Sequence, residues 1–205
     1  MPPRKDTRTR LLDAAMAVFR TKGYSATSVD DLCRAAGVTK GAFFHHFRTK
    51  EEVAVAGAAH FGEMAAALFG VAPYRQLQDP LDRLLGYIDF RTAILEGEIA
   101  EYTCLLGTMV QEAYATHPAI REACAREIVG HALTAEADIA ALLALQGSVD
   151  FTAASLALHI QGVLQGAFIL AKATGDARVA ADSLGHLRRY LTLLFEPQPQ
   201  PEALS

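Results

Sequence analysis

Long apolar runs are scarce in this chain of 205 residues, although 51% of its residues are apolar. No window approaches the roughly 20 uninterrupted apolar residues that a membrane-spanning helix needs. The first ten residues, MPPRKDTRTR, also lack the apolar centre of a secretory signal peptide. We therefore expect a cytoplasmic protein that has no membrane partner.

Cysteine is also scarce, and neither cysteine nor histidine occurs at the spacing of a metal site. The three cysteines, Cys33, Cys104 and Cys124, are an odd number, and a reducing cytoplasm disfavours disulfide bonds. The seven histidines form no HExxH or comparable pattern. We therefore expect neither a metal ion nor a cofactor.

The chain lacks a nucleophile motif and a phosphate-binding loop, so the sequence gives little support to an enzyme. An enzymatic alternative would have to use Cys104 with His117 or His131. Strand-like alternation and internal repeats are missing as well. Helical patterns instead follow one another, separated by glycine and proline, which predicts an all-α fold.

Positive charge is concentrated at the start of the chain. Residues 1–50 contain ten Lys or Arg and four Asp or Glu, whereas residues 51–205 contain nine and nineteen. The net charge of −4 therefore hides a basic N-terminal segment and an acidic remainder. A basic segment of this kind suits the phosphates of DNA, although it also suits a solvated surface.

The stretch from Thr27 to Val53 has the pattern of a DNA-reading helix-turn-helix. Ser28 and Asp31 have the spacing of a capping box. Gly37 fits a turn at positive φ, and Thr39 can cap the helix that follows. One face of each helix is apolar and is predicted to be buried: Val29, Leu32, Cys33 and Ala36 in the first helix, and Phe43 and Phe47 in the second.

Several motifs in the first quarter of the chain together resemble TetR-family transcriptional regulators. They are RTRLLDAAMAVFRTKGY from Arg8 to Tyr24, Thr27–Ser28–Val29, Ala36–Gly37–Val38–Thr39, Phe44–His45–His46–Phe47 and Lys50–Glu51–Glu52. The resemblance implies an N-terminal three-helix head that binds DNA. It also implies a larger helical domain for ligand binding and dimerisation, with about nine helices in total.

The resemblance implies a division of roles on the outward face of the second helix. Lys40, Ala42 and His45 lie where the family touches base edges, and Gly41 shares this face. Lys40 can donate to guanine O6 or N7, and Ala42 can touch a thymine methyl group. Positions that the family uses for the DNA backbone are Ser28, Thr39, Phe44, His46 and Lys50.

Two features qualify this DNA-binding prediction. Phe44 stands where the family usually has a tyrosine, so a hydroxyl hydrogen bond to phosphate is missing. Near the start of the chain, the basic residues Arg4, Lys5, Arg8 and Arg10 form either an arm that reaches a minor groove or a solvated chain end.

Beyond the motif we expect a long connecting helix from Lys50 to about Gly70 and then a loop at 71–79. Further helices are predicted at about 80–95, 102–116, 118–146, 150–173 and 177–195. This organisation predicts a DNA-binding domain at 1–50 and a ligand-binding and dimerisation domain at 51–195. The Pro-rich segment 196–205 is predicted to be a disordered tail.

Two of the predicted helices are more apolar than a surface helix requires. Residues 151–173 are apolar nearly all round, and residues 184–195 place Leu187, Tyr190, Leu191 and Leu194 on one stripe. The resemblance implies that the last two long helices pair with their copies in a homodimer. A two-fold dimer is expected to bind a palindromic operator. The alternative is that these surfaces are buried within one subunit.

The resemblance also implies a small, mostly apolar effector that releases the protein from DNA. The candidate lining of the effector pocket consists of polar residues on helices that are predicted to be buried, with neighbouring aromatic and apolar residues. These residues are Phe61, Met64, Tyr87, Phe90, Cys104, Thr108, Glu112, Gln161, Gln165 and Phe168. Each also has an ordinary explanation as a core or solvated residue. The favoured function is a ligand-responsive repressor; the alternatives are a regulator without an effector, an activator, or a redox or electrophile sensor that uses Cys104.

Overall fold

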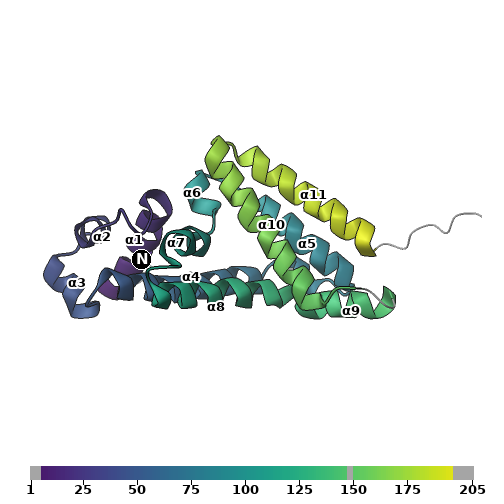
Figure 1. Cartoon of the computed structure of the whole chain (residues 1–205), viewed down its shortest axis with the longest axis horizontal. Coiled ribbons are helices and arrows are strands. Elements are labelled where there is room, and N and C mark those ends of the chain that lie inside the picture. The colour runs from purple at the N-terminus through teal and green to yellow at the C-terminus, as the bar shows by residue number, and fades with distance from the viewer. Residues whose placement is uncertain (1–5, 147–149, 196–205) are drawn as a thin grey trace, which may run out of the picture. The chain divides into compact units, whose positions relative to one another are not determined.

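A computed structural model describes residues 6–146 and 150–195, and within these ranges the chain is helical and contains no strand (Figure 1). The predicted all-α fold is therefore confirmed. The helices are α1 (Thr7–Lys22), α2 (Val29–Ala36), α3 (Lys40–His46), α4 (Lys50–Gly70), α5 (Pro80–Ala93), α6 (Ile99–Tyr102), α7 (Leu105–Ala113), α8 (Pro118–Ala132), α9 (Glu136–Gln146), α10 (Ala153–Thr174) and α11 (Ala177–Phe195), with short 3-10 turns η1 (Pro73–Gln76) and η2 (Leu133–Ala135).

The helices divide into two compact units. The first contains the residues up to Val71 together with Glu96–His131, and the second contains Ala72–Leu95 together with the residues from Ala132 onward. The sequence-based division at residue 50 differs from this one, because α4, α6, α7 and α8 belong to the same unit as the helix-turn-helix.

Helix α1 is the centre of the first unit. It begins at Asp6, whose carboxylate accepts a hydrogen bond from the Thr9 N–H at 2.7 Å, and it ends at Gly23, which has φ +83°. Its buried face includes Leu11, Leu12, Ala15 and Phe19. This face packs against α2, α3, α4, α6 and α7, so one helix holds both the DNA-reading motif and the helices that come later in the chain.

The core of the first unit is continuous. Phe43 of α3 and Leu32 of α2 belong to the same buried cluster as Leu105 and Met109 of α7 and Ile120 of α8. Helices α4 and α8 lie side by side (Figure 1), and the rings of Phe69 and His131 are 4.8 Å apart. The helix-turn-helix therefore shares its core with more distant parts of the chain.

The second unit contains α5, α9, α10 and α11. Helix α10 begins with a capping box between Thr152 and Ser155, and it buries Leu156, Ile160, Leu164 and Phe168. Ion pairs connect the helices: Arg83 of α5 bonds Asp138 of α9, and Arg188 of α11 bonds Asp89 of α5 at 2.8 Å. Helices α10 and α11 pack against each other.

Most predicted helices agree with the structure, but two predictions need refinement. The helix expected at 102–116 is the short α6 followed by α7, because Thr103 and Cys104 have extended backbone and Cys104 caps α7. The helix expected at 118–146 is α8 and α9 joined by η2. The predicted tail at 196–205 lies outside the described residues.

The prediction that no segment is long and apolar enough to span a membrane also needs correction. By length and composition alone, three helical stretches of the described chain are long and apolar enough to cross a membrane: Lys50–Gly70, Pro118–Gln146 and Ala153–Thr174. Counting uninterrupted apolar residues missed them because isolated polar residues, such as Gln161 and Gln165, divide the apolar sequence.

Adjacent phenylalanines in α3 test this description of the core. Phe43 is fully buried, whereas the Phe44 side chain is 53% exposed. Phe43→Ala should lower the free energy of unfolding by about 3–5 kcal/mol because it leaves a cavity in the shared core. Phe44→Ala should change it by less than about 1 kcal/mol, as exposed substitutions usually do. Urea unfolding followed by circular dichroism measures both values; similar losses would contradict the assigned orientation of α3.

Candidate functional site

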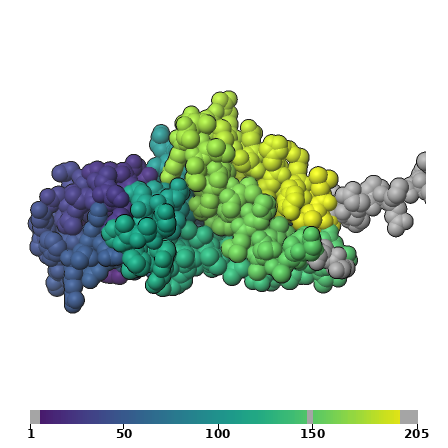
Figure 2. Space-filling model, in the orientation of Figure 1, coloured from purple at the N-terminus to yellow at the C-terminus, as the bar shows by residue number. Residues whose placement is uncertain are grey.

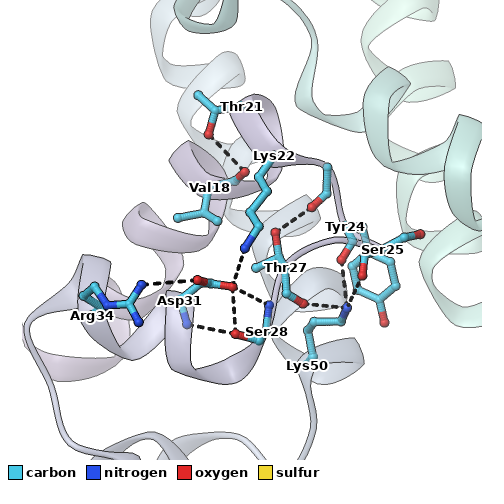
Figure 3. A network of polar contacts seen from close by, with 11 residues as sticks. Val18, Thr21, Lys22, Tyr24, Ser25, Thr27, Ser28, Asp31, Arg34 and Lys50 are labelled. Atoms are coloured by element: carbon cyan, nitrogen blue, oxygen red, sulfur yellow. Dashed lines mark hydrogen bonds and ion pairs between the residues drawn. The ribbon is translucent and has the colours of Figure 1, made fainter.

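The helix-turn-helix begins with the predicted capping box. Asp31 accepts a hydrogen bond from the Ser28 N–H at 2.9 Å, and the Asp31 N–H donates to Ser28 Oγ at 3.2 Å. The Asp31 carboxylate also bonds Lys22 Nζ at 2.7 Å (Figure 3). These bonds hold the pKa of Asp31 well below its usual range, the Lys22 contact being the largest cause. The start of α2 is therefore tied to the end of α1.

The turn between α2 and α3 has the predicted left-handed glycine. Gly37 has φ +62°, and the Val38 N–H donates to Cys33 O at 2.9 Å. Arg10 of α1 donates from its guanidinium to the carbonyl oxygens of Ala36 and Gly37. Because these carbonyls end a helix, the arginine supplies hydrogen bonds that the helix cannot. Helix α1 therefore fixes the turn as well as the start of α2.

Helix α3 presents the outward face that the sequence predicted. Thr39 caps it by accepting a hydrogen bond from the Ala42 N–H at 3.1 Å. Phe43 and Phe47 are buried and fix the orientation of the helix. The opposite face is exposed to solvent: Lys40, Gly41, Phe44, His45 and His46, with Ala42 half-buried. Figure 2 shows the side chains of α2 and α3, in blue-purple, on the surface of the first unit.

Lys50 has a structural role that the sequence did not indicate. Its Nζ donates to the carbonyl oxygens of Tyr24 and Thr27 at 2.8 Å each, and Ser25 O lies at 3.5 Å (Figure 3). It also lies 4.2 Å from the centre of the Tyr24 ring. Burial lowers the pKa of Lys50, and the charge of Glu112 opposes that shift. The ammonium group predicted to anchor phosphate is thus already bonded to the turn between α1 and α2.

Two of the four residues of the predicted basic arm lie in the part of the chain that the structure describes. Arg4 and Lys5 lie outside the described residues. Arg8 and Arg10 belong to α1, where Arg8 lies over the Phe47 ring and Arg10 bonds the turn after α2. These two arginines therefore stabilise the helix-turn-helix from within the fold.

Five of the ten predicted effector residues lie in the first unit. Cys104 caps α7, and Thr108 Oγ1 donates to Cys104 O at 3.2 Å. The Phe61 ring contacts the Arg20 guanidinium, and the Met64 side chain is 50% exposed. Glu112 is bonded to the DNA-reading region, because its carboxylate accepts the Ser25 N–H at 2.8 Å.

The other five predicted effector residues lie in the second unit. Tyr87 OH accepts a hydrogen bond from Arg91 Nε at 3.1 Å, and the Phe90 ring packs against Tyr74. Phe168 is buried in α10. Gln161 Oε1 and Gln165 Nε2 are buried and have no hydrogen-bond partner among the described residues. Buried polar atoms usually have a partner, so these two amides are available to a ligand or to water.

Sequence reasoning missed three residues that act near these sites. Burial of Arg20 in α1 lowers its pKa, and the groups that oppose this shift are Cys104 and Glu101. Asp30 forms an ion pair with Lys40 at 2.8 Å, and Arg10 holds the turn after α2. No local spacing in the sequence indicates that Arg20 lies near Cys104 and Glu101, because these residues come together only through the packing of α1 against α6 and α7.

Known proteins resemble this chain mainly at its N-terminus. Residues 11–56 match the family model of bacterial regulatory proteins of the tetR family. The HTH-type transcriptional regulator SrpR of Pseudomonas putida is 47% identical over 49 residues, which are 24% of this chain and 23% of SrpR. The HTH-type transcriptional repressor KstR2 of Mycobacterium tuberculosis H37Rv is 39% identical over 83 residues, which are 38% of this chain and 39% of KstR2.

The similarity of the fold extends further than that of the sequence. A TetR transcriptional regulator from Chloroflexus aurantiacus superposes with a TM-score of 0.78 and 26% sequence identity, over 91% of this chain and 94% of that structure. A TetR-family regulator from Agrobacterium tumefaciens superposes with a TM-score of 0.77 at 19% identity, over 90% and 96% of the two chains. By contrast, this chain matches only about a quarter to two fifths of the length of its curated relatives.

Lys50 provides a test of the site geometry. Lys50→Ala should lower the free energy of unfolding by about 1–3 kcal/mol because three backbone carbonyls lose a charged donor. Lys50→Arg keeps the charge but changes the shape of the donor group, so it should recover only part of the stability. Chemical unfolding in the absence of DNA measures the loss. A stable Lys50→Ala variant with weakened DNA binding would instead indicate that Lys50 acts mainly on phosphate.

Proposed function

We propose that the chain is a TetR-family regulator, and more specifically a ligand-responsive transcriptional repressor that binds a palindromic operator as a homodimer. The observation that carries this proposal is the geometry of α3. Its inner face is buried through Phe43 and Phe47, while most of its outer face is exposed. A helix held in this way can enter a major groove.

Base reading is assigned to the outward side chains of α3. Lys40, Ala42 and His45 read base edges, and Gly41 allows a close approach to the DNA because it has no side chain. Ser28, Thr39, Phe44 and His46 contact the sugar-phosphate backbone. At the start of α4 the phosphate contact comes from N-terminal amides, since the Lys50 ammonium already bonds the turn between α1 and α2.

Dimerisation is assigned to α10 and α11. Both helices expose large apolar side chains outside the core of the second unit: Leu158, Ile169, Leu170, Tyr190 and Leu193. An exposed apolar surface of this kind favours association with a second copy of the chain. Association by two-fold symmetry would give the protein two reading helices, as a palindromic operator requires. We propose a cytoplasmic location for the same reason, since the operator is in the cytoplasm.

Coupling between effector and DNA is assigned to α7. This helix carries the predicted effector residues Cys104 and Thr108, and its Glu112 bonds the Ser25 N–H. Just beyond α7, the His117 ring packs against Tyr24 at 5.0 Å. A ligand that displaces α7 would therefore displace the turn that precedes the helix-turn-helix. The ligand releases DNA only if it binds the displaced state more tightly.

The effector is assigned a mostly apolar character with a few hydrogen-bonding groups. Tyr87, Phe90 and Phe168 supply apolar surface in the second unit, where Gln161 and Gln165 hold polar atoms without partners. Ligand sites commonly combine such apolar walls with a few well-placed polar groups.

The test is selection of bound sequences from random duplex DNA by the purified protein. We expect enrichment of a palindrome and binding of one dimer per site. Lys40→Ala should change the preferred base at one position in each half-site, by roughly tenfold in discrimination. If Lys40→Ala lost affinity equally for all sequences, the base-reading role of Lys40 would be contradicted. If the wild type enriched no site, the proposed function would be refuted.

A second candidate function, sensing of electrophiles through Cys104, is favoured by the position of Arg20. Arg20 is partly buried and forms no ion pair within the described chain, and the groups whose charges would act on its guanidinium are Cys104 and Glu101. A neighbouring guanidinium stabilises a thiolate, which is the reactive form of cysteine. Cys104 is half-buried, whereas Cys33 and Cys124 are buried, and burial raises the pKa of Cys124 to about 12.

N-ethylmaleimide tests this second function, because a thiolate adds to its double bond and the neighbouring carbon takes up a proton. We expect Cys104 to react first and Arg20→Met to slow the reaction by about threefold or more. Mass spectrometry of the folded protein measures both effects, and Cys33 and Cys124 serve as internal controls. If modified protein keeps its operator affinity, or if all three cysteines react equally, Cys104 is not a sensor.

A further inference from the structure

An ion pair connects the two helices of the DNA-reading motif. Asp30 is the second residue of α2, and Lys40 is the first residue of α3. Lys40 Nζ lies 2.8 Å from Asp30 Oδ1, and both side chains are more than half exposed, at 62% and 54%. The contact therefore lies on the surface that carries the outward residues of α3, and the hydrogen bond to Asp30 raises the pKa of Lys40.

Asp30 lies in the first turn of α2, where a negative charge stabilises the helix, but it takes no part in the cap. Its neighbour Asp31 forms the capping box with Ser28 and bonds Lys22 and Arg34. Helix α2 therefore has its cap and its link to α1 without Asp30. The contact of Asp30 with Lys40 instead sets the position of a flexible side chain on the reading surface.

We propose that Asp30 is a positioning residue that makes base reading by Lys40 more selective and lowers the affinity of the protein for DNA in general. This inference rests on the proposed function. A lysine side chain has a flexible four-carbon stem and an ammonium group with three donors. When Asp30 accepts one of them, the stem is held in one direction, and the remaining donors face a defined place in the groove.

The charge of Asp30 acts in the same direction. A free Lys40 ammonium would bind phosphate on any sequence, and such contacts supply most non-specific affinity. An exposed carboxylate on the DNA-facing surface opposes phosphate and partly neutralises Lys40. The affinity for non-operator DNA therefore falls more than the affinity for the operator, because at the operator Lys40 still gains its contact with a base. Specificity often uses such an unfavourable element against the wrong partner.

Asp30→Asn tests the proposal, since it keeps the shape of the side chain and removes its charge. The variant should bind non-operator duplexes more tightly, and its affinity should fall more steeply with salt, by about one unit of the logarithmic slope. Discrimination at the base pair read by Lys40 should also fall, but by less than the roughly tenfold expected for Lys40→Ala. Glu63→Gln is the matched control, because Glu63 is an exposed acid on α4 whose removal changes the net charge equally.

The double variant separates positioning from simple charge. In a Lys40→Ala background, Asp30→Asn should leave sequence preference unchanged, because no lysine remains to be positioned. Thermal unfolding of each variant checks that it is folded, and Asp30→Ser serves in place of Asp30→Asn if the latter is not.

Two outcomes would overturn the inference in different ways. If the wild type enriches an operator but Asp30→Asn binds all sequences more tightly by the same factor as Glu63→Gln, Asp30 has no positioning role. If the wild type enriches no operator, the proposed function fails and the inference fails with it.

Discussion

The turn at residues 23–27, between α1 and α2, is the constraint on which the first unit depends. Its backbone carbonyls cannot be satisfied by helix hydrogen bonds, and Lys50 supplies donors to Tyr24 O and Thr27 O. On the same turn, Glu112 accepts the Ser25 N–H, and its carboxylate occupies the space that a Cβ at Gly23 would need. Side chains from α4 and α7 therefore hold one short turn, and the reading helices follow directly from it.

This arrangement explains why the compact unit is larger than a three-helix head. The buried cluster that contains Phe43 also contains Leu105, Met109 and Ile120, so α7 and α8 complete the core beneath the helix-turn-helix. A division at residue 50 would expose this surface to water. The same packing connects α7 to the helix-turn-helix, since Glu112 contacts Ser25 and His117 contacts Tyr24 within this turn.

Features set by neighbouring residues could be predicted from the sequence, whereas features set by distant residues could not. The capping box of Ser28 and Asp31, the left-handed Gly37 and the buried Phe43 each depend on spacing within one or two helical turns. By contrast, Lys50 bonds the carbonyl oxygen of Tyr24, which is 26 residues away in the sequence, and Glu112 bonds the N–H of Ser25, which is 87 residues away. Such contacts depend on how helices pack, so the sequence did not indicate that Lys50 and Glu112 bond this turn. The two-part helix at 118–146 escaped prediction because no proline or glycine marks η2.

The charge of the head is a poor measure of its contacts with DNA. Residues 1–50 contain ten basic side chains, but Lys22 and Arg34 bond Asp31, Lys40 bonds Asp30, and Arg10 and Lys50 bond backbone carbonyls. A basic group already bonded within the protein releases fewer DNA counterions than a free one. These internal bonds instead fix α2 to the end of α1, and the start of α4 to the turn at residues 23–27. Much of the positive charge of residues 1–50 therefore stabilises the fold of the helix-turn-helix.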